Sequence, residues 1–201
     1  MKLKELRDRI RGEVTTSSER AYAVLRRSLM WNQLVPERYP RAIVQPDSEA
    51  DVVEVVKFAR ANQLKVAVRG GGHSWIGYSL HDDGLLIDLG RLNKVAIDCA
   101  ARVAVIQPSV RSREFNRSLA AQGLAFPVGH CPTVAMSGFL LNGGLGWNCN
   151  GWGPGCLSIK ERKSSPATAS WLLRARARIP ICCGLFAAQG RASLVWSLNT
   201  R

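Results

Sequence analysis

Two glycine-rich stretches constrain this chain more than any other feature of its sequence. The first, Gly70-Gly71-Gly72, directly follows the strand-like run Lys65–Val68, and the second extends from Gly129 to Gly155. Glycines permit positive φ angles, so that successive backbone N–H groups can turn toward one anion. We therefore expect the first stretch to bind a phosphate group. A plain tight turn is the alternative for three glycines considered alone.

Neither stretch matches the common nucleotide-binding fingerprints. No Gly-Lys-Ser/Thr ending follows the glycines, and Trp75 and Cys149 stand where a G-x-G-x-x-G pattern requires its last glycine. His73 comes directly after Gly72, which puts an imidazole beside any ligand of the loop. Cys131 lies between a histidine and a proline at a predicted turn. A buried small hydrophobic residue is the alternative interpretation of that thiol.

The spacing of apolar residues predicts a mixed α+β domain. Helices are expected from about 48 to 62 and from 111 to 122, the first with Asp47 or Ser48 as N-cap and the second ending at Gly123. The expected strands are 41–44, 65–68, 85–88, 95–98 and 103–106. Several strands follow one another without an intervening helix, which favours an α+β fold over a strict βαβ array. We divide the chain into a helical lead-in (1–35), a main domain (36–159) and an atypical tail (160–201).

The composition limits the class of protein. With 201 residues, 46% of them hydrophobic, the chain can form one packed domain and is not intrinsically disordered. No run approaches the roughly 20 apolar residues of a membrane span. The charged N-terminus lacks the apolar core of a secretory signal, so we expect a cytoplasmic protein that does not contact membranes. The six cysteines form no C-x-x-C pair, and we expect no metal site.

The net charge of +13 raises the alternative of a basic nucleic-acid-binding protein. Residues 160–201 contain eight Lys and Arg residues and one acidic residue, Glu161. More than half of the net charge therefore lies in the last fifth of the chain. This distribution argues against nucleic-acid binding by the main domain.

The two stretches together resemble the FAD-binding domain named after p-cresol methylhydroxylase and shared with vanillyl-alcohol oxidase. The motifs are V-R-G-G-G-H-S-W-x-G-x-S and G-H-C-P-T-V-x-x-x-G-x-L-L-x-G-G-L-G-W, and the resemblance covers about Pro40 to Ile159. The subgroup that carries both motifs is that of berberine-bridge-enzyme-like oxidoreductases. This resemblance implies a two-subdomain FAD-binding fold, here incomplete at its C-terminus.

The resemblance also implies which residues bind the cofactor. Those in the first motif would hold the FAD pyrophosphate, and those in the second would line the isoalloxazine and ribityl chain. His73 would be bonded covalently to the flavin 8α-methyl group, and Cys131 to flavin C6 in members with two bonds. The cofactor-binding residues carried over are Arg69, Gly70, Gly71, Gly72, His73, Ser74, Gly129, His130, Cys131, Thr133, Val134, Ser137, Gly138, Gly143, Gly144 and Gly146. Relatives often have glycine where this chain has Ser109, Ala135 and Asn142, so we expect weaker FAD binding than in those relatives.

The chemistry that the resemblance implies is flavin-dependent oxidation. The flavin would accept a hydride from an alcohol-type small molecule, such as a sugar, and oxygen would reoxidise it. In the family a base on a second domain removes the proton. The sequence offers no such domain, so the catalytic residues, the substrate and the oligomeric state stay unassigned. A non-functional fragment is the alternative.

The tail has a composition unlike the rest of the chain, with an Arg-Ala-Arg-Ala-Arg run at 174–178. A shifted reading frame can be written by joining the third base of each codon from Arg162 on to the first two bases of the next codon. Synonymous codons leave some of these bases open, and one of the resulting translations contains EVVTGDGELV followed later by DLLWAVRGAG. The shifted string resembles the stretch that ends the FAD domain in this family. We therefore expect residues 160–201 to be a frameshifted, poorly ordered tail that leaves sheet edges unpaired, and a chain that does not turn over substrate.

Overall fold

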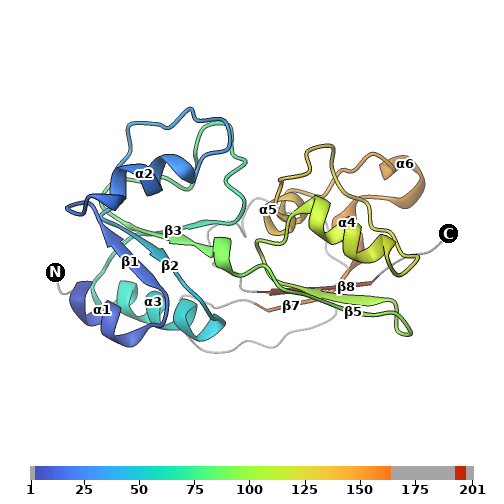
Figure 1. Ribbon diagram of the computed structural model, residues 1–201, viewed down its shortest axis with the longest axis horizontal. Helices are drawn as coiled ribbons and strands as arrows, with labels where there is room; N and C mark the ends of the chain where they lie inside the picture. The colour runs from blue at the N-terminus through green and yellow to red at the C-terminus, as the bar shows by residue number, and fades with distance from the viewer. Residues whose placement is uncertain (1–2, 164–192, 198–201) are drawn as a thin grey trace.

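The computed structural model describes residues 3–163 and 193–197, which form two lobes side by side (Figure 1). The elements of the first lobe are α1 (Leu3–Arg9), β1 (Glu13–Thr16), α2 (Ala21–Ser28), β2 (Ala42–Gln45), α3 (Glu49–Ala61), β3 (Val66–Arg69), β4 (Leu85–Asp88) and the 3₁₀ turn η1 (Leu89–Arg91). Those of the second are β5 (Val95–Asp98), β6 (Val103–Ile106), α4 (Ser112–Ala120), α5 (Met136–Leu141), α6 (Cys149–Trp152), η2 (Gly155–Ser158), β7 (Ile159–Lys163) and β8 (Ser193–Ser197).

The first lobe is built on a four-stranded sheet with the order β1-β2-β4-β3. Strands β2, β4 and β3 are parallel, and β1 is antiparallel at the edge. The register pairs Arg69 with Asp88, so both residues lie at the carboxyl edge of the sheet. The first glycine-rich stretch begins at that edge, where open α/β sheets usually bind ligands.

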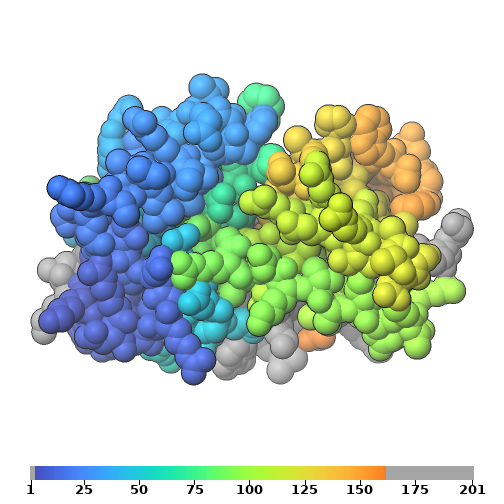
Figure 2. Space-filling view, in the orientation of Figure 1, coloured from blue at the N-terminus to red at the C-terminus, as the bar shows by residue number. Residues whose placement is uncertain are grey.

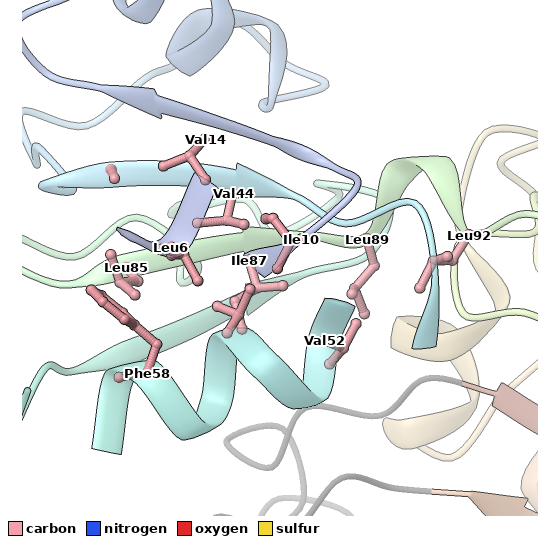
Figure 3. Close-up of a cluster of buried hydrophobic side chains, with 13 residues drawn as sticks. Leu6, Ile10, Val14, Val44, Val52, Phe58, Leu85, Ile87, Leu89 and Leu92 are labelled. Atoms are coloured by element: carbon pink, nitrogen blue, oxygen red, sulfur yellow. The ribbon is translucent and has the colours of Figure 1, made fainter. Parts of the chain in front are cut away.

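Helices cover both faces of this sheet. On one face, shown in Figure 3, side chains of α1 and α3 such as Leu6 and Phe58 pack against Val44 and Ile87 of the strands. On the other face, Tyr22 of α2 joins a second cluster with Leu86. Helix α3 begins where its sequence predicts, because the Ser48 side chain accepts a hydrogen bond from the Asp51 N–H. Burial on both faces holds the sheet rigid beneath the glycine stretch.

The second lobe is an antiparallel sheet with the order β5-β6-β8-β7, covered by α4 and α5. Its core contains Phe115 and Leu119 of α4, Met136 and Leu140 of α5, and Ile106 of β6. The mixed α+β fold is thus confirmed, and the strands at 85–88, 95–98 and 103–106 have the predicted bounds.

The two ends of the chain differ from the sequence expectations. The lead-in contains strand β1 as well as helices, because the β-branched run Val14-Thr15-Thr16 pairs with β2. In the tail, the short run Ser193–Ser197 forms β8 between β6 and β7, instead of leaving both edges unpaired. The expected poor order of residues 164–192 and 198–201 falls outside the described residues. In the described part of the chain, no helix is both long and apolar enough to cross a membrane.

Candidate functional site

The two glycine-rich stretches meet between the lobes. A Cβ atom on Gly70 would lie 2.6 Å from the Ser137 Oγ, and one on Gly71 would lie 2.8 Å from the backbone nitrogen of Ala135. The hydroxyl of Ser109 donates to the Gly70 carbonyl at 3.3 Å. Only glycine permits this approach, so the first stretch (the glycine loop, residues 70–74) is fixed against the start of α5. In the space-filling view a hollow separates the upper parts of the two lobes (Figure 2).

His73 links the two motifs directly. Its Nε2 lies 2.9 Å from the Thr133 Oγ1, and its ring stacks on Trp31 with ring centroids 5.1 Å apart and an interplanar angle of 9°. Burial, with the nearby positive charges of Arg111 and Arg69, lowers the pKa of His73 below its usual 6.5. The imidazole is therefore neutral at physiological pH, which leaves one ring nitrogen with a free lone pair.

Arg69 supports the glycine loop from beneath. Its guanidinium donates to the Asp88 carboxylate at 2.7 Å and to the Leu29 carbonyl at 3.1 Å, and its side chain is 12% exposed. Asp88 also accepts from the Gly90 N–H at 3.2 Å and from the Gln45 amide at 3.0 Å. The resemblance assigns Arg69 to the pyrophosphate cradle. In the structure its charge is already neutralised by a buried carboxylate, so it shapes the loop.

The glycine loop has the properties that a diphosphate requires. The N–H groups of Gly71, Gly72 and His73 have no hydrogen-bond acceptor among the described residues. Gly72 has φ +70°, which turns the loop back toward the lead-in. Unpaired neighbouring N–H groups on a glycine turn can bind an anion. The residues present therefore fit the pyrophosphate of a dinucleotide.

The second motif contributes a free thiol and a folded-back loop. Cys131 is half-buried and free, and the ring of its exposed neighbour His130 lies 5.5 Å from that of Trp147. Gly144 and Gly146 are close to backbone: a Cβ on Gly146 would lie 2.7 Å from the Val128 carbonyl oxygen. These two glycines hold the loop together, whereas Gly138 faces open space.

A cavity of about 310 Å³ lies elsewhere, at the amino ends of β3 and β4. Its lining includes Lys65, Ser79 and His81, and no residue of the glycine loop or the second motif. We assign the functional site to the loops, because the unpaired N–H groups, His73 and Cys131 converge there. The residues that line the cavity offer no comparable combination of unpaired backbone N–H groups, imidazole and thiol.

The profile of a family described as "FAD binding domain" matches residues 40–163, more than half of the chain. The chain belongs to this FAD-binding-domain family. It is 38% identical over 130 residues to the FAD-linked oxidoreductase penO of Penicillium crustosum, an alignment that covers 65% of this chain and 29% of that protein.

Solved structures agree with the assignment to the FAD-binding-domain family. 6-Hydroxy-D-nicotine oxidase from Arthrobacter nicotinovorans superposes with a TM-score of 0.81 at 28% identity, covering 94% of this chain and 42% of the other. Berberine bridge enzyme from Eschscholzia californica has the same fold, with a TM-score of 0.83 at 23% identity, covering 98% and 43%. This chain thus spans less than a third of the penO protein and less than half of either solved structure.

Sequence reasoning missed three residues of this site. Trp31 lies in the lead-in, outside both motifs, and no sequence pattern links it to His73. Its neighbour Asn32 donates a hydrogen bond to the Trp75 carbonyl next to the glycine loop. Asp88 ends a predicted strand, and its pairing with Arg69 follows only from the parallel register. Arg111 comes near His73 because α4 begins beside the second motif, where the Ser112 N–H donates to the Val134 carbonyl.

Proposed function

We propose that this FAD-binding domain belongs to an oxidoreductase that removes a hydride from an alcohol-type small molecule and is reoxidised by oxygen, with its flavin held covalently. The observation that carries the proposal is the contact between His73 and Thr133 across the two motifs. His73 is a neutral imidazole, and the free thiol of Cys131 lies two residues along the chain from its partner Thr133. FAD, when bound, would supply the hydride acceptor.

Different segments of this chain would bind different parts of the cofactor. The N–H groups of Gly71, Gly72 and His73 would bind the pyrophosphate, and the segment from Gly129 to Gly144 would border the flavin ring. His73 and Cys131 would provide the two covalent bonds. Two similar proteins, an FAD-linked oxidoreductase and 6-hydroxy-D-nicotine oxidase, support an oxidative role. The substrate, and a cytoplasmic location, are proposals that rest on the sequence.

Covalent attachment at His73 can be tested on the chain itself. Protein produced with FAD should keep its flavin absorbance after acid precipitation and show flavin fluorescence on a denaturing gel. The Cys131→Ala variant, in which His73 is the remaining attachment point, should keep both signals, and the double variant His73→Ala/Cys131→Ala should lose them. A matched control is His81→Ala, because His81 lies in the loop before β4 and borders the separate cavity. A folded wild-type chain without denaturation-resistant flavin would contradict the proposal.

A second bond at Cys131 has its own measurement. Peptide mass mapping of flavin-loaded protein should find flavin on the peptide that contains Cys131, and alkylation should not modify that thiol. Cys99, which is exposed and free, serves as the alkylation control. An alkylatable Cys131 in flavin-loaded protein would leave a single bond, at His73.

A further inference from the structure

Three residues at the end of the lead-in contact the glycine loop and the residues on either side of it. The Leu29 carbonyl accepts from the Arg69 Nε at 3.1 Å, and the Trp31 N–H donates to the Gly72 carbonyl at 3.3 Å. The Asn32 side-chain amide donates to the Trp75 carbonyl, also at 3.3 Å. Residues 29–32 precede the part of the chain that matches the FAD-binding-domain family. The lead-in is therefore a structural part of the site.

Within this segment, the Trp31 ring acts on His73 itself. The indole lies nearly parallel to the imidazole, with centroids 5.1 Å apart, and Trp75 packs edge-on against the indole at 5.2 Å and 86°. The stack fixes the plane of the imidazole. The Thr133 hydroxyl, 2.9 Å from Nε2, fixes its rotation within that plane. These two contacts come from opposite lobes.

The hydrogen bond of Nε2 with the Thr133 hydroxyl, supported by the backbone of the same residue, occupies one side of the ring. When Nε2 carries the proton and donates it to Thr133, the lone pair is on Nδ1. A nucleophile held in one orientation reacts faster than a freely rotating one, because the entropy of alignment is already lost.

We propose that Trp31 and Thr133 are positioning residues that orient His73 for covalent flavin attachment. The inference rests on the proposed function. In the reaction a bond forms between the His73 nitrogen and the 8α carbon of the flavin, while that carbon and the imidazole each lose a proton. The two electrons released reduce the flavin ring, and dioxygen then takes them together with two protons to give hydrogen peroxide.

The test compares the rate of attachment in matched variants. Trp31→Leu keeps apolar volume without the stacked ring, and Trp31→Phe restores a flat ring. Thr133→Val removes the hydroxyl at constant shape, and Thr133→Ser restores it. Trp152→Leu, on α6, controls for the loss of a tryptophan in the second lobe. All variants also carry Cys131→Ala, so that only the His73 bond can form, and the readout is flavin fluorescence of the denatured chain over time after FAD is added.

We expect Trp31→Leu and Thr133→Val to slow attachment by roughly tenfold or more, with recovery in Trp31→Phe and Thr133→Ser and no change in Trp152→Leu. FAD affinity is measured separately in a His73→Ala/Cys131→Ala background, where neither covalent bond can form, and Trp31→Leu should change it by less than about threefold. A large loss of affinity there would identify Trp31 as part of the FAD cradle and overturn the positioning role.

The stacking of Trp31 on His73 can also be measured by NMR without flavin. The indole face shields a stacked imidazole, so the His73 ring proton resonances should lie upfield and return to ordinary positions in Trp31→Leu. Wild-type attachment rates in both Leu and Val variants would overturn this inference and leave the proposed function intact. Absence of any covalent flavin in the folded wild-type chain would overturn both.

Discussion

At Gly72 the backbone has φ +70°, and a Cβ atom would lie 2.0 Å from the Leu29 carbonyl oxygen. That oxygen belongs to backbone and is held by Arg69, so it cannot move away without breaking the contact between lead-in and loop. The same residue also carries one of the unpaired N–H groups of the site. Gly72 therefore serves the shape of the loop and the binding of an anion at once.

We predict that Gly72→Ala lowers the free energy of unfolding by roughly 3 kcal/mol or more, through a strained φ and a backbone clash. Gly123→Ala is the matched control, because Gly123 has φ +67° with nothing within 4 Å of a Cβ atom. That control should cost about 1–2 kcal/mol from the dihedral alone. Urea unfolding measures both. Equal losses at the two positions would show that the close approach to Leu29 has no energetic weight.

The protonation of His73 depends on its surroundings, first on burial and then on the positive charge of Arg111. We predict that Arg111→Gln raises the pKa of His73 toward its usual 6.5, because a repulsive charge is removed. NMR titration of the imidazole measures it. The folded state disfavours the protonated ring, so this group contributes stability above about pH 6.5 that is lost as pH falls through the lowered pKa. An unchanged midpoint would leave burial as the cause.

Among the elements, α3 has the best-defined beginning, and the reason is a buried carboxylate. Asp51 is 4% exposed, yet it accepts from the backbone N–H groups of Arg11, Gly12 and Asp47 at 2.9 to 3.3 Å. Burial by itself raises the pKa of Asp51, but these hydrogen bonds outweigh it and hold the pKa below the usual 3.8. One side chain thus joins α3 to the turn between α1 and β1.

We predict that Asp51→Asn destabilises the fold by roughly 1–3 kcal/mol, because an amide cannot accept at both positions. Stability from Asp51 should be complete above its unfolded pKa and be lost as pH falls through the lower folded value. Glu49→Gln, in the same helical turn, should change stability by less than about 1 kcal/mol. Denaturant unfolding at neutral pH and near pH 3 measures both effects. Equal effects of the two changes would contradict this role.

At the scale of the whole molecule, the two lobes need each other to form the site. The first lobe supplies the glycine loop and Trp31, and the second supplies Thr133, Ser137 and Cys131. The second lobe's sheet depends on the tail, because β8 lies between β6 and β7. A change in β8 therefore acts on the sheet of the lobe that carries Thr133 and Cys131.

We predict that the gene, read in the shifted frame after Arg162, encodes a family-like continuation followed by a second domain. Sequencing the gene and its flanking region measures this directly. Protein made from the repaired frame should unfold at higher denaturant concentration, because a continuous strand pair would replace the basic tail. It should also oxidise substrate, whereas the 201-residue chain should not. Robust turnover by the present chain, or a shifted frame with early stop codons, would refute the prediction.

The sequence by itself determined the local structure and the identity of the site. A short apolar run predicted the strand at 85–88, and runs rich in β-branched residues predicted those at 95–98 and 103–106. Ser48 predicted the start of α3, because a helix cap depends on neighbours in the chain. The motifs around His73 and Cys131 identified the family, whose FAD-binding profile covers residues 40–163.

Only the tertiary structure decided which residues act together. The parallel register brought Asp88 to Arg69, so the guanidinium that the family resemblance assigns to phosphate binding also supports the loop. The packing of α2 brought Trp31 onto His73, 42 positions further along the chain, and strand β1 arose because β2 offered a free edge. Such contacts join distant segments, and their free energy depends on the whole packed arrangement, so no local pattern in the sequence encodes them.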